Sequence, residues 1–164
     1  MKFAVSIVQT LHDSPLGPII LAASKKQVVG IWFAGQRHQP DTSHWARDEH
    51  DPLLQRVKTE IDEYFAGQRH SFDLPLDMEC GTAFQQTVWR AMLAIPYGSS
   101  TSYGALSTAI GKPRAVRALG GAVGRNPFSI VVPCHRVIGS QGSLTGYAGG
   151  LDRKTALLQL EGVL

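Results

Sequence analysis

A β-branched apolar run, Ile130–Val132, leads directly into the tetrapeptide Pro133-Cys134-His135-Arg136. Runs of Val and Ile bounded by turn residues are typical of buried strands. Proline has no backbone N–H and interrupts a ladder of hydrogen bonds, so we expect the strand to end just before Cys134. The pattern therefore predicts a rigid strand that presents a thiol at its end, which would suit a nucleophile.

The length and composition of the chain are those of a globular protein. It has 164 residues, of which 43% are hydrophobic, and a mean hydropathy of −0.05. That length is enough for one domain or for two small domains that share a core. No apolar run approaches the length of a membrane span and the N-terminus lacks a signal-peptide pattern, so we expect a cytoplasmic protein. The two cysteines, Cys80 and Cys134, cannot build a disulfide framework.

Charge is distributed unevenly along the chain. Residues 1–80 carry 8 Lys and Arg against 11 Asp and Glu, whereas residues 81–164 carry 8 against 2. No acidic residue lies between Glu79 and Asp152. A long basic stretch without acidic residues favours a polyanionic partner, and nucleic acid is the leading candidate. An uneven surface charge without any partner is the alternative.

The first half of the chain predicts a small antiparallel sheet followed by a helix. Strands are expected over Phe3–Thr10, Ile19–Ala23 and Gln27–Phe33, because these segments alternate or are rich in β-branched residues. A helix is expected from Pro52 until Gly67 ends it.

The polar segment between the last expected strand and this helix, residues 36–51, is expected to be a loop. Its histidines, His38, His44 and His50, suggest a zinc site, but residues six positions apart do not lie on one face of a helix. No cysteine accompanies them, so solvated loop histidines are favoured.

The second half predicts helices with recognisable ends. Thr82 and Gln85 have the spacing of a capping box at the start of the first helix. Ser102 is a good N-cap for a second helix that ends near Ile110, and a third helix is expected over Arg114–Val123. Two short helices around the Gly111-Lys112-Pro113 turn fit a helix-turn-helix.

The third expected helix contains the pair Gly120-Gly121, which costs about 1 kcal/mol for each residue relative to alanine. Small residues allow another backbone to come close. One interpretation is tight packing against a neighbouring element of the protein. The other is close approach to DNA, with Arg114 and Arg117 as charged contacts. Both remain open from the residues alone.

Cys134 and His135 are a candidate nucleophile and base. A cysteine attacks only as the thiolate, so its ordinary pKa of about 8.5 has to be lowered. Neighbours on a strand point to opposite faces, so we expect a water molecule to link the imidazole to the thiol. From the residues alone, a buried structural thiol and a structural histidine are the alternatives.

Pro133-Cys134-His135-Arg136 and its surroundings resemble the O6-alkylguanine-DNA alkyltransferases, in which this tetrapeptide is the signature. The resemblance is dense over residues 80–164 and loose over residues 1–79. It is carried, in matching order and spacing, by Ser102-Tyr103-Gly104, Ala115-Val116-Arg117-Ala118, Gly120-Gly121-Ala122, Asn126-Pro127, Gly146-Tyr147-Ala148-Gly149-Gly150 and Leu157-Leu158-Gln159-Leu160-Glu161-Gly162.

The resemblance implies a catalytic group around Cys134 as the alkyl acceptor. His135 and Glu161 would complete a proton relay through water, and Asn126 would support the turn that positions this network. Tyr103 would press on the target phosphate and donate a proton to the flipped base. From spacing alone, Glu161 is equally well a solvated acid at a helix end.

The resemblance also implies a substrate pocket. Tyr147 and Ala148 would belong to the loop that closes the pocket, and the backbone of Cys134 and Val137 would read the guanine edge. The small side chain of Ala148 favours room for larger alkyl groups or for alkylated thymine.

The resemblance further implies that the partner is double-stranded DNA, bound through the minor groove by the helix-turn-helix. Arg117 would fill the space that the flipped base leaves. The other implied contacts on or beside the third helix are Arg114, Ala115, Ala118, Gly120 and Gly121.

By the same resemblance the protein is an α/β (α+β) monomer of two domains. Residues 1–79 would form a small ribonuclease-H-like domain with an antiparallel sheet. Residues 80–164 would form a mostly helical domain with a helix-turn-helix of winged-helix type. The thioether product would limit each molecule to a single turnover. The reaction would need no cofactor. No cysteine precedes Cys80, so we expect no structural zinc.

Three other functions compete with alkyl transfer. A cysteine hydrolase would need an oxyanion hole, which nothing in the sequence specifies. A protein that binds alkylated bases without repairing them would lack the acceptor cysteine, and Cys134 is present. A transcription regulator would be expected to carry base-reading Asn, Gln or Arg residues along its recognition helix, and this helix lacks such a row.

Overall fold

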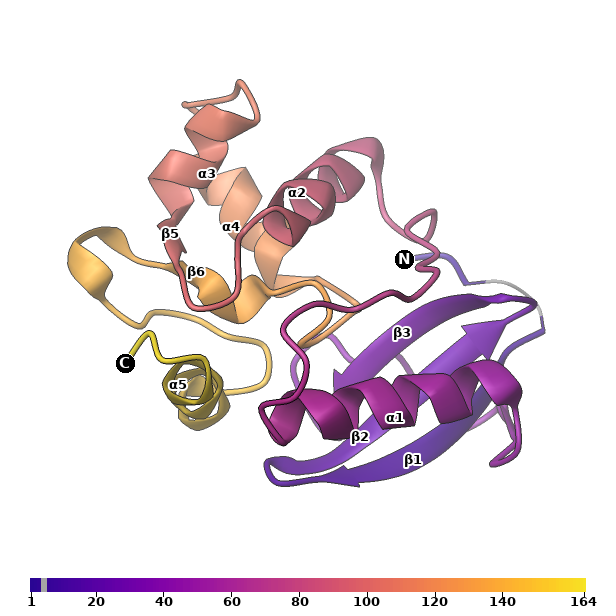
Figure 1. Ribbon diagram of the computed structural model, residues 1–164. Helices are drawn as coiled ribbons and strands as arrows, with labels where there is room; N and C mark the ends of the chain where they lie inside the picture. Colours follow the sequence, from indigo (N-terminus) through magenta and orange to yellow (C-terminus); the bar gives the residue numbers. More distant parts are fainter. Residues whose placement is uncertain (4–5) are drawn as a thin grey trace.

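The first half of the chain forms a sheet with a helix against it (Figure 1). The computed structural model describes residues 1–3 and 6–164. The strands run in the order β3-β2-β1-β4, in which β2 is antiparallel to both neighbours and β4 is parallel to β1. The elements are β1 (Val8–Ser14), β2 (Gly17–Ser24), β3 (Gln27–Phe33), β4 (Ala46–Arg47) and α1 (Pro52–Phe65).

Most of the elements predicted for this half are confirmed. The predicted second and third strands correspond to β2 and β3, and α1 begins at Pro52, with Asp51 accepting a hydrogen bond from the Leu54 amide at 2.9 Å. The first strand was predicted too early, since β1 runs over Val8–Ser14, and residues 4 and 5 of that prediction lie outside the described residues. The short strand β4 was not predicted within the loop.

The second half contains a group of helices and a two-stranded parallel sheet (Figure 1). None of the helices in the described part of the chain combines the length and apolarity that a bilayer span requires. The elements are α2 (Ala83–Leu93), β5 (Thr101–Ser102), α3 (Tyr103–Ala109), α4 (Val116–Gly124), the 3-10 helix η1 (Cys134–Arg136), β6 (Val137–Ile138), the 3-10 helix η2 (Ser140–Gly142) and α5 (Leu151–Leu160).

Local capping signals are confirmed in this half, with one shift. The side chains of Thr82 and Gln85 form both bonds of the capping box, and Ser102 accepts from the amide of Ala105 at 3.0 Å. The third helix, α4, begins at Val116 rather than at Arg114. The amide of Ala115 donates to the Lys112 carbonyl at 2.9 Å, which is a turn bond, so Arg114 lies in the turn before the helix.

The prediction of a strand over Ile130–Val132 is wrong. Ile130 has a φ of 73°, and the Val132 amide donates to the carbonyl of Phe128 at 2.9 Å, within a turn. An apolar run predicts burial, which is confirmed, but it does not by itself distinguish a strand from a buried turn. Cys134 therefore begins the 3-10 helix η1, and the expectation that it and His135 point to opposite faces of a strand does not apply.

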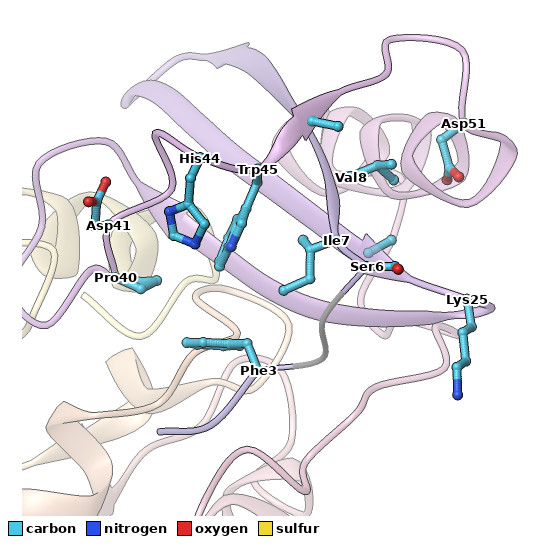
Figure 2. Close-up of a pocket in the computed structure, with 12 residues that line it drawn as sticks. Phe3, Ser6, Ile7, Val8, Lys25, Pro40, Asp41, His44, Trp45 and Asp51 are labelled. Atoms are coloured by element: carbon cyan, nitrogen blue, oxygen red, sulfur yellow. The ribbon is translucent and has the colours of Figure 1, made fainter.

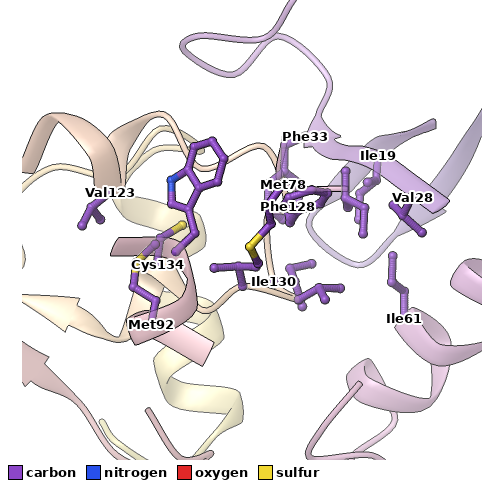
Figure 3. Close-up of a cluster of buried hydrophobic side chains, with 14 of the residues drawn as sticks. Ile19, Val28, Phe33, Ile61, Met78, Met92, Val123, Phe128, Ile130 and Cys134 are labelled. Atoms are coloured by element: carbon purple, nitrogen blue, oxygen red, sulfur yellow. The ribbon is translucent and has the colours of Figure 1, made fainter. Parts of the chain in front are cut away.

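One hydrophobic core joins the two halves of the chain (Figure 3). Ile61 from α1 and Met92 from α2 belong to the same buried cluster as Phe128 and Cys134. The backbone of β3 also reaches across: the Ile31 amide donates to the Pro127 carbonyl at 2.7 Å, and the Ile31 carbonyl accepts from Ser129 at 2.9 Å. The first half therefore holds the segment that leads to the thiol.

Candidate active site

Cys134 is a free, buried thiol that is 6% exposed. The side-chain amide of Asn126 donates to the sulfur at 3.2 Å and to the carbonyl of Val132 at 2.8 Å. The amide oxygen of Asn126 accepts from the backbone N–H of Phe128 at 2.9 Å. Asn126 thus ties together both ends of the turn that carries the thiol.

The protonation state of Cys134 depends on opposing effects. Burial raises the pKa of the thiol, because the thiolate loses hydration. The Asn126 hydrogen bond lowers it, as do the positive charge of Lys154 and the backbone amides of Cys134 and His135. Burial has the larger effect, so the thiol is protonated at neutral pH and its attack requires a base.

His135 is completely buried, and its Nε2 lies 2.8 Å from the Oε1 atom of Glu161. Burial lowers the pKa of His135. Burial alone would raise the pKa of Glu161, but hydrogen bonds from His135 and Arg136 bring it to about 2. An ionised carboxylate only accepts hydrogen bonds, so the neutral imidazole donates through Nε2. Its Nδ1 atom has no partner among the described residues and is free to act as a base.

Arg136 and Tyr64 also bind Glu161, and neither contact was predicted from the sequence. Arg136 donates from Nε to Oε2 at 2.9 Å and from Nη2 to Oε1 at 2.7 Å. Tyr64 donates to Oε1 at 2.8 Å. The available signal was a tyrosine on the buried face of α1, since a buried phenol usually has a hydrogen-bond partner. Glu161 is 5% exposed, so the alternative of a solvated surface acid is wrong.

A pocket of about 270 Å³ opens above the thiol. It brings together many of the residues predicted from the sequence. Two unpredicted lining residues, Arg37 and His38, come from the first half of the chain, where the Arg37 amide donates to the carbonyl of Ala148 at 3.0 Å. The lining consists of Arg37, His38, Tyr103, Gly120, Gly121, Val123, Gly124, Arg125, Cys134, Gly146, Tyr147 and Ala148.

Two phenols line this pocket. The hydroxyl of Tyr103 donates to the carbonyl of Thr145 at 3.2 Å, and burial, together with the nearby Cys134, raises its pKa. The hydroxyl of Tyr147 is buried and has no partner in the part of the chain that the structure describes. Burial raises its pKa as well, so both phenols remain protonated and are potential donors to a bound ligand.

Val137 is placed differently from the other predicted pocket residues. It is fully buried in β6 and does not line the pocket. Its carbonyl accepts a 2.7 Å hydrogen bond from Nζ of Lys154. A role for its backbone in reading a guanine edge therefore stays a prediction.

Apart from Tyr103, which begins α3, the predicted DNA contacts lie on or just before α4. Arg114, Arg117 and Ala118 are exposed, while Ala115, Gly120 and Gly121 are half-buried. A Cβ atom added at Gly120 would meet no atom within 4 Å. Internal packing therefore does not require glycine at that position. The buried side chain of Trp89 binds α4, because its indole N–H donates to the carbonyl of Ala122 at 2.9 Å.

A second, larger hollow of about 680 Å³ lies in the first half of the chain (Figure 2). Phe3 and Trp45 form its apolar wall, and charged side chains of both signs, such as Lys25 and Asp41, stand around it. It contains none of the residues bound to Cys134 or Glu161. The smaller pocket, by contrast, contains the Cys134 thiol. A buried thiol together with a buried imidazole that is bound to a carboxylate has the features of an enzyme with a cysteine nucleophile.

Comparison with known families identifies the class of this enzyme. Residues 83–163 match the 6-O-methylguanine DNA methyltransferase DNA binding domain, and residues 7–78 match the ribonuclease-like domain of the same proteins. The chain therefore belongs to the 6-O-methylguanine DNA methyltransferase family. The enzyme class and the fold class predicted from the sequence are confirmed.

Individual relatives are similar over nearly the whole chain. A methylated-DNA–protein-cysteine methyltransferase of Mycobacterium tuberculosis is 47% identical over 91% of this chain and 88% of its own length. One from Haemophilus influenzae is 41% identical over 95% of this chain and 87% of its own length.

Solved structures agree with these relatives. The crystal structure of the Mycobacterium tuberculosis O6-methylguanine methyltransferase superposes with a TM-score of 0.87 at 45% identity, covering 95% of this chain and 93% of that one. A crystal structure of the mycobacterial protein in complex with DNA gives the same TM-score at 44% identity, covering 96% and 93%.

Proposed function

We propose that this chain repairs duplex DNA by moving an alkyl group from O6 of guanine to its own Cys134, once per molecule and without a cofactor. O4-alkylthymine is proposed as a second substrate, because the small side chain of Ala148 leaves space in the pocket. The observation that carries the proposal is the buried thiol below a pocket beside α4, with a neutral imidazole held by a buried carboxylate.

The proposed reaction begins with proton transfer. The free Nδ1 atom of His135 takes the proton of the Cys134 thiol through a water molecule, while Glu161 holds the ring by Nε2. The thiolate then attacks the alkyl carbon, the new S–C bond forms, and the C–O6 bond breaks with its electron pair moving to the purine. Tyr103 donates a proton to the base, which makes the base a better leaving group, and the proton that His135 took from the thiol replaces the one that the phenol has lost. The products are a thioether on Cys134 and an unmodified guanine.

Access to the alkyl group requires that the nucleotide leave the duplex, because a folded protein cannot bring a thiol to O6 inside the stack. Flipping costs a few kcal/mol, and less for a damaged pair. We propose that Arg117 fills the vacated space and that Arg114 contacts phosphate. The minor groove is only about 6 Å wide, which suits the small side chains Ala115 and Ala118 and the glycine pair. The DNA complex of the mycobacterial relative supports DNA as the partner.

A single turnover follows from the chemistry of the product. Thiol exchange cannot cleave a thioether. The other cysteine, Cys80, is buried, and burial raises its pKa to about 11, so it is a poor attacking group. We further propose that the protein acts as a monomer of two domains, residues 1–79 and 80–164.

The deciding experiment is intact-mass analysis after mixing the protein with duplex DNA that contains one O6-methylguanine. The proposal requires a gain of one methyl group, mapped to Cys134, and no second transfer when more DNA is added. Cys134→Ala should bind the same DNA and remove nothing. Loss of the lesion while the protein mass stays constant would indicate turnover chemistry and contradict the suicide mechanism. Binding without any transfer would indicate recognition alone.

A further inference from the structure

We propose that Tyr64, from the first half of the chain, is a positioning residue for alkyl transfer that sets the proton affinity of His135 through Glu161. This inference rests on the proposed function, in which His135 receives the proton of the thiol. It gives the first half a role in the chemistry as well as in the fold.

Tyr64 and His135 share one oxygen atom of Glu161. Oε1 accepts three hydrogen bonds: from Tyr64 at 2.8 Å, from Nε2 of His135 at 2.8 Å and from Nη2 of Arg136 at 2.7 Å. Tyr64 and His135 are both 0% exposed. Bulk water is therefore excluded from this oxygen, and a change in one donor acts directly on the others.

The Tyr64 hydrogen bond keeps the same direction at every working pH. Burial raises the pKa of Tyr64 far above its usual range, and the charge of Glu161 raises it further, so the phenol stays protonated. The carboxylate stays ionised because the hydrogen bonds from His135 and Arg136 hold the pKa of Glu161 at about 2. The phenol therefore withdraws negative charge from the oxygen that binds His135. Without the phenol, more of that charge would stabilise the imidazolium.

Other charged or titratable groups also face this network. Arg136 balances the carboxylate charge, and the Lys154 ammonium acts on both His135 and Cys134. Tyr147 is close enough for the charge of Glu161 to affect its pKa, as is Tyr97. None of these is a neutral donor to Oε1, so the effect of Tyr64 is separable from theirs.

Tyr97 supplies a matched control. Its ring meets that of Tyr64 edge-on at 6.2 Å, and its hydroxyl donates to the carbonyl of Leu160 at 3.3 Å rather than to Glu161. The exposed His70 stacks on the Tyr97 ring at 3.9 Å, and Phe at this position keeps the ring for that contact. Tyr64→Phe and Tyr97→Phe each remove one hydroxyl from the same region, but only the first removes a donor from Glu161.

The experiment measures the single-turnover rate of methyl transfer against pH, together with a nuclear magnetic resonance titration of His135 in histidine-labelled protein. In Tyr64→Phe the acid limb of the rate profile should move to higher pH. At the pH where the wild type reaches half of its plateau rate, the variant should reach a fraction of its own plateau rate that is about two- to fivefold smaller. Tyr97→Phe should leave the limb in place.

Site-specific 3-fluorotyrosine at position 64 tests the opposite sign and keeps the ring and the hydrogen bond. It is a stronger donor, so the limb should move to lower pH. Loss of packing cannot move the limb in opposite directions in the two proteins. An acid limb and a His135 titration that stay unchanged in both would show that Tyr64 is only structural. If the wild-type protein transfers no methyl group, the proposed function fails, whereas the His135 titration still decides whether Tyr64 acts through Glu161.

Discussion

Replacing Glu161 by Gln should reveal how much the buried carboxylate contributes to stability. Gln has nearly the same shape but no charge, so it mimics the protonated acid. The pKa of Glu161 falls from an ordinary value of 4.5 to about 2 in the folded protein. One pKa unit corresponds to about 1.4 kcal/mol, so at neutral pH the charge contributes about 3 kcal/mol. Removing one partner of a buried ion pair costs about 3–5 kcal/mol, which agrees.

The pH dependence of this effect has a definite sign. The folded-state pKa of Glu161 is lower than that of the unfolded chain, so its charge stabilises the protein fully above about pH 4.5. This contribution is lost as the pH falls towards 2. The free energies of unfolding of the wild type and of Glu161→Gln should therefore differ at pH 7 and converge in acid.

Urea unfolding at pH 7 and at a series of acidic pH values measures this difference directly. A double variant, Glu161→Gln with Arg136→Met, is the control, because it removes the unpaired guanidinium. It should recover much of the stability and should still transfer alkyl groups slowly, since His135 loses the carboxylate charge that stabilises its imidazolium. Equal stability of Glu161→Gln and the wild type at pH 7, or a difference that persists unchanged in acid, would refute the reasoning.

Three further substitutions test other parts of the site. Asn126→Ala removes the hydrogen bond to Cys134 that lowers the thiol pKa, so iodoacetamide should alkylate Cys134 more slowly at neutral pH, and an unchanged rate would contradict this. Gly120→Ala should raise the unfolding free energy by about 0.5–1 kcal/mol, because the Cβ meets open space, yet weaken DNA binding in a fluorescence anisotropy assay. Tyr147→Phe should raise thermal stability slightly, since it removes a buried hydroxyl that has no partner in the described residues, but slow methyl transfer in a single-turnover assay.

The features that the sequence predicted correctly are those with local causes. The capping box at Thr82 and the cap at Ser102 involve residues within one helical turn, so their spacing is visible in the sequence. The strands β2 and β3 follow from short apolar runs between turns. The turn at Ile130 was missed because it is fixed by contacts distant in sequence, including the backbone pairing with Ile31.

The residues of the site divide in the same way, into those that are recognisable from the local sequence and those that only the fold brings together. The candidates Cys134 and His135 were evident from their chemistry, but the role of Glu161 came only from family resemblance. Its donor Tyr64 lies 97 positions away in the sequence and belongs to an ordinary apolar stripe of a helix. No periodicity indicates such a pairing. The signal was the phenol oxygen of Tyr64 on that stripe, which needed a partner once it was buried.

The contacts between the two halves fall on different parts of the site. β3 pairs with the turn before Cys134, Arg37 bonds to the pocket wall at Ala148, and Tyr64 bonds to the carboxylate behind His135. By contrast, the indole of Trp89 holds α4 from within the second half. The helix α4, which is proposed to bind DNA, is therefore fixed by a contact within the second half, whereas the segments proposed to perform the transfer are bound by residues of the first half. Residues far from Cys134 in the sequence thus contact the turn before the thiol, the wall of its pocket and the carboxylate bound to His135.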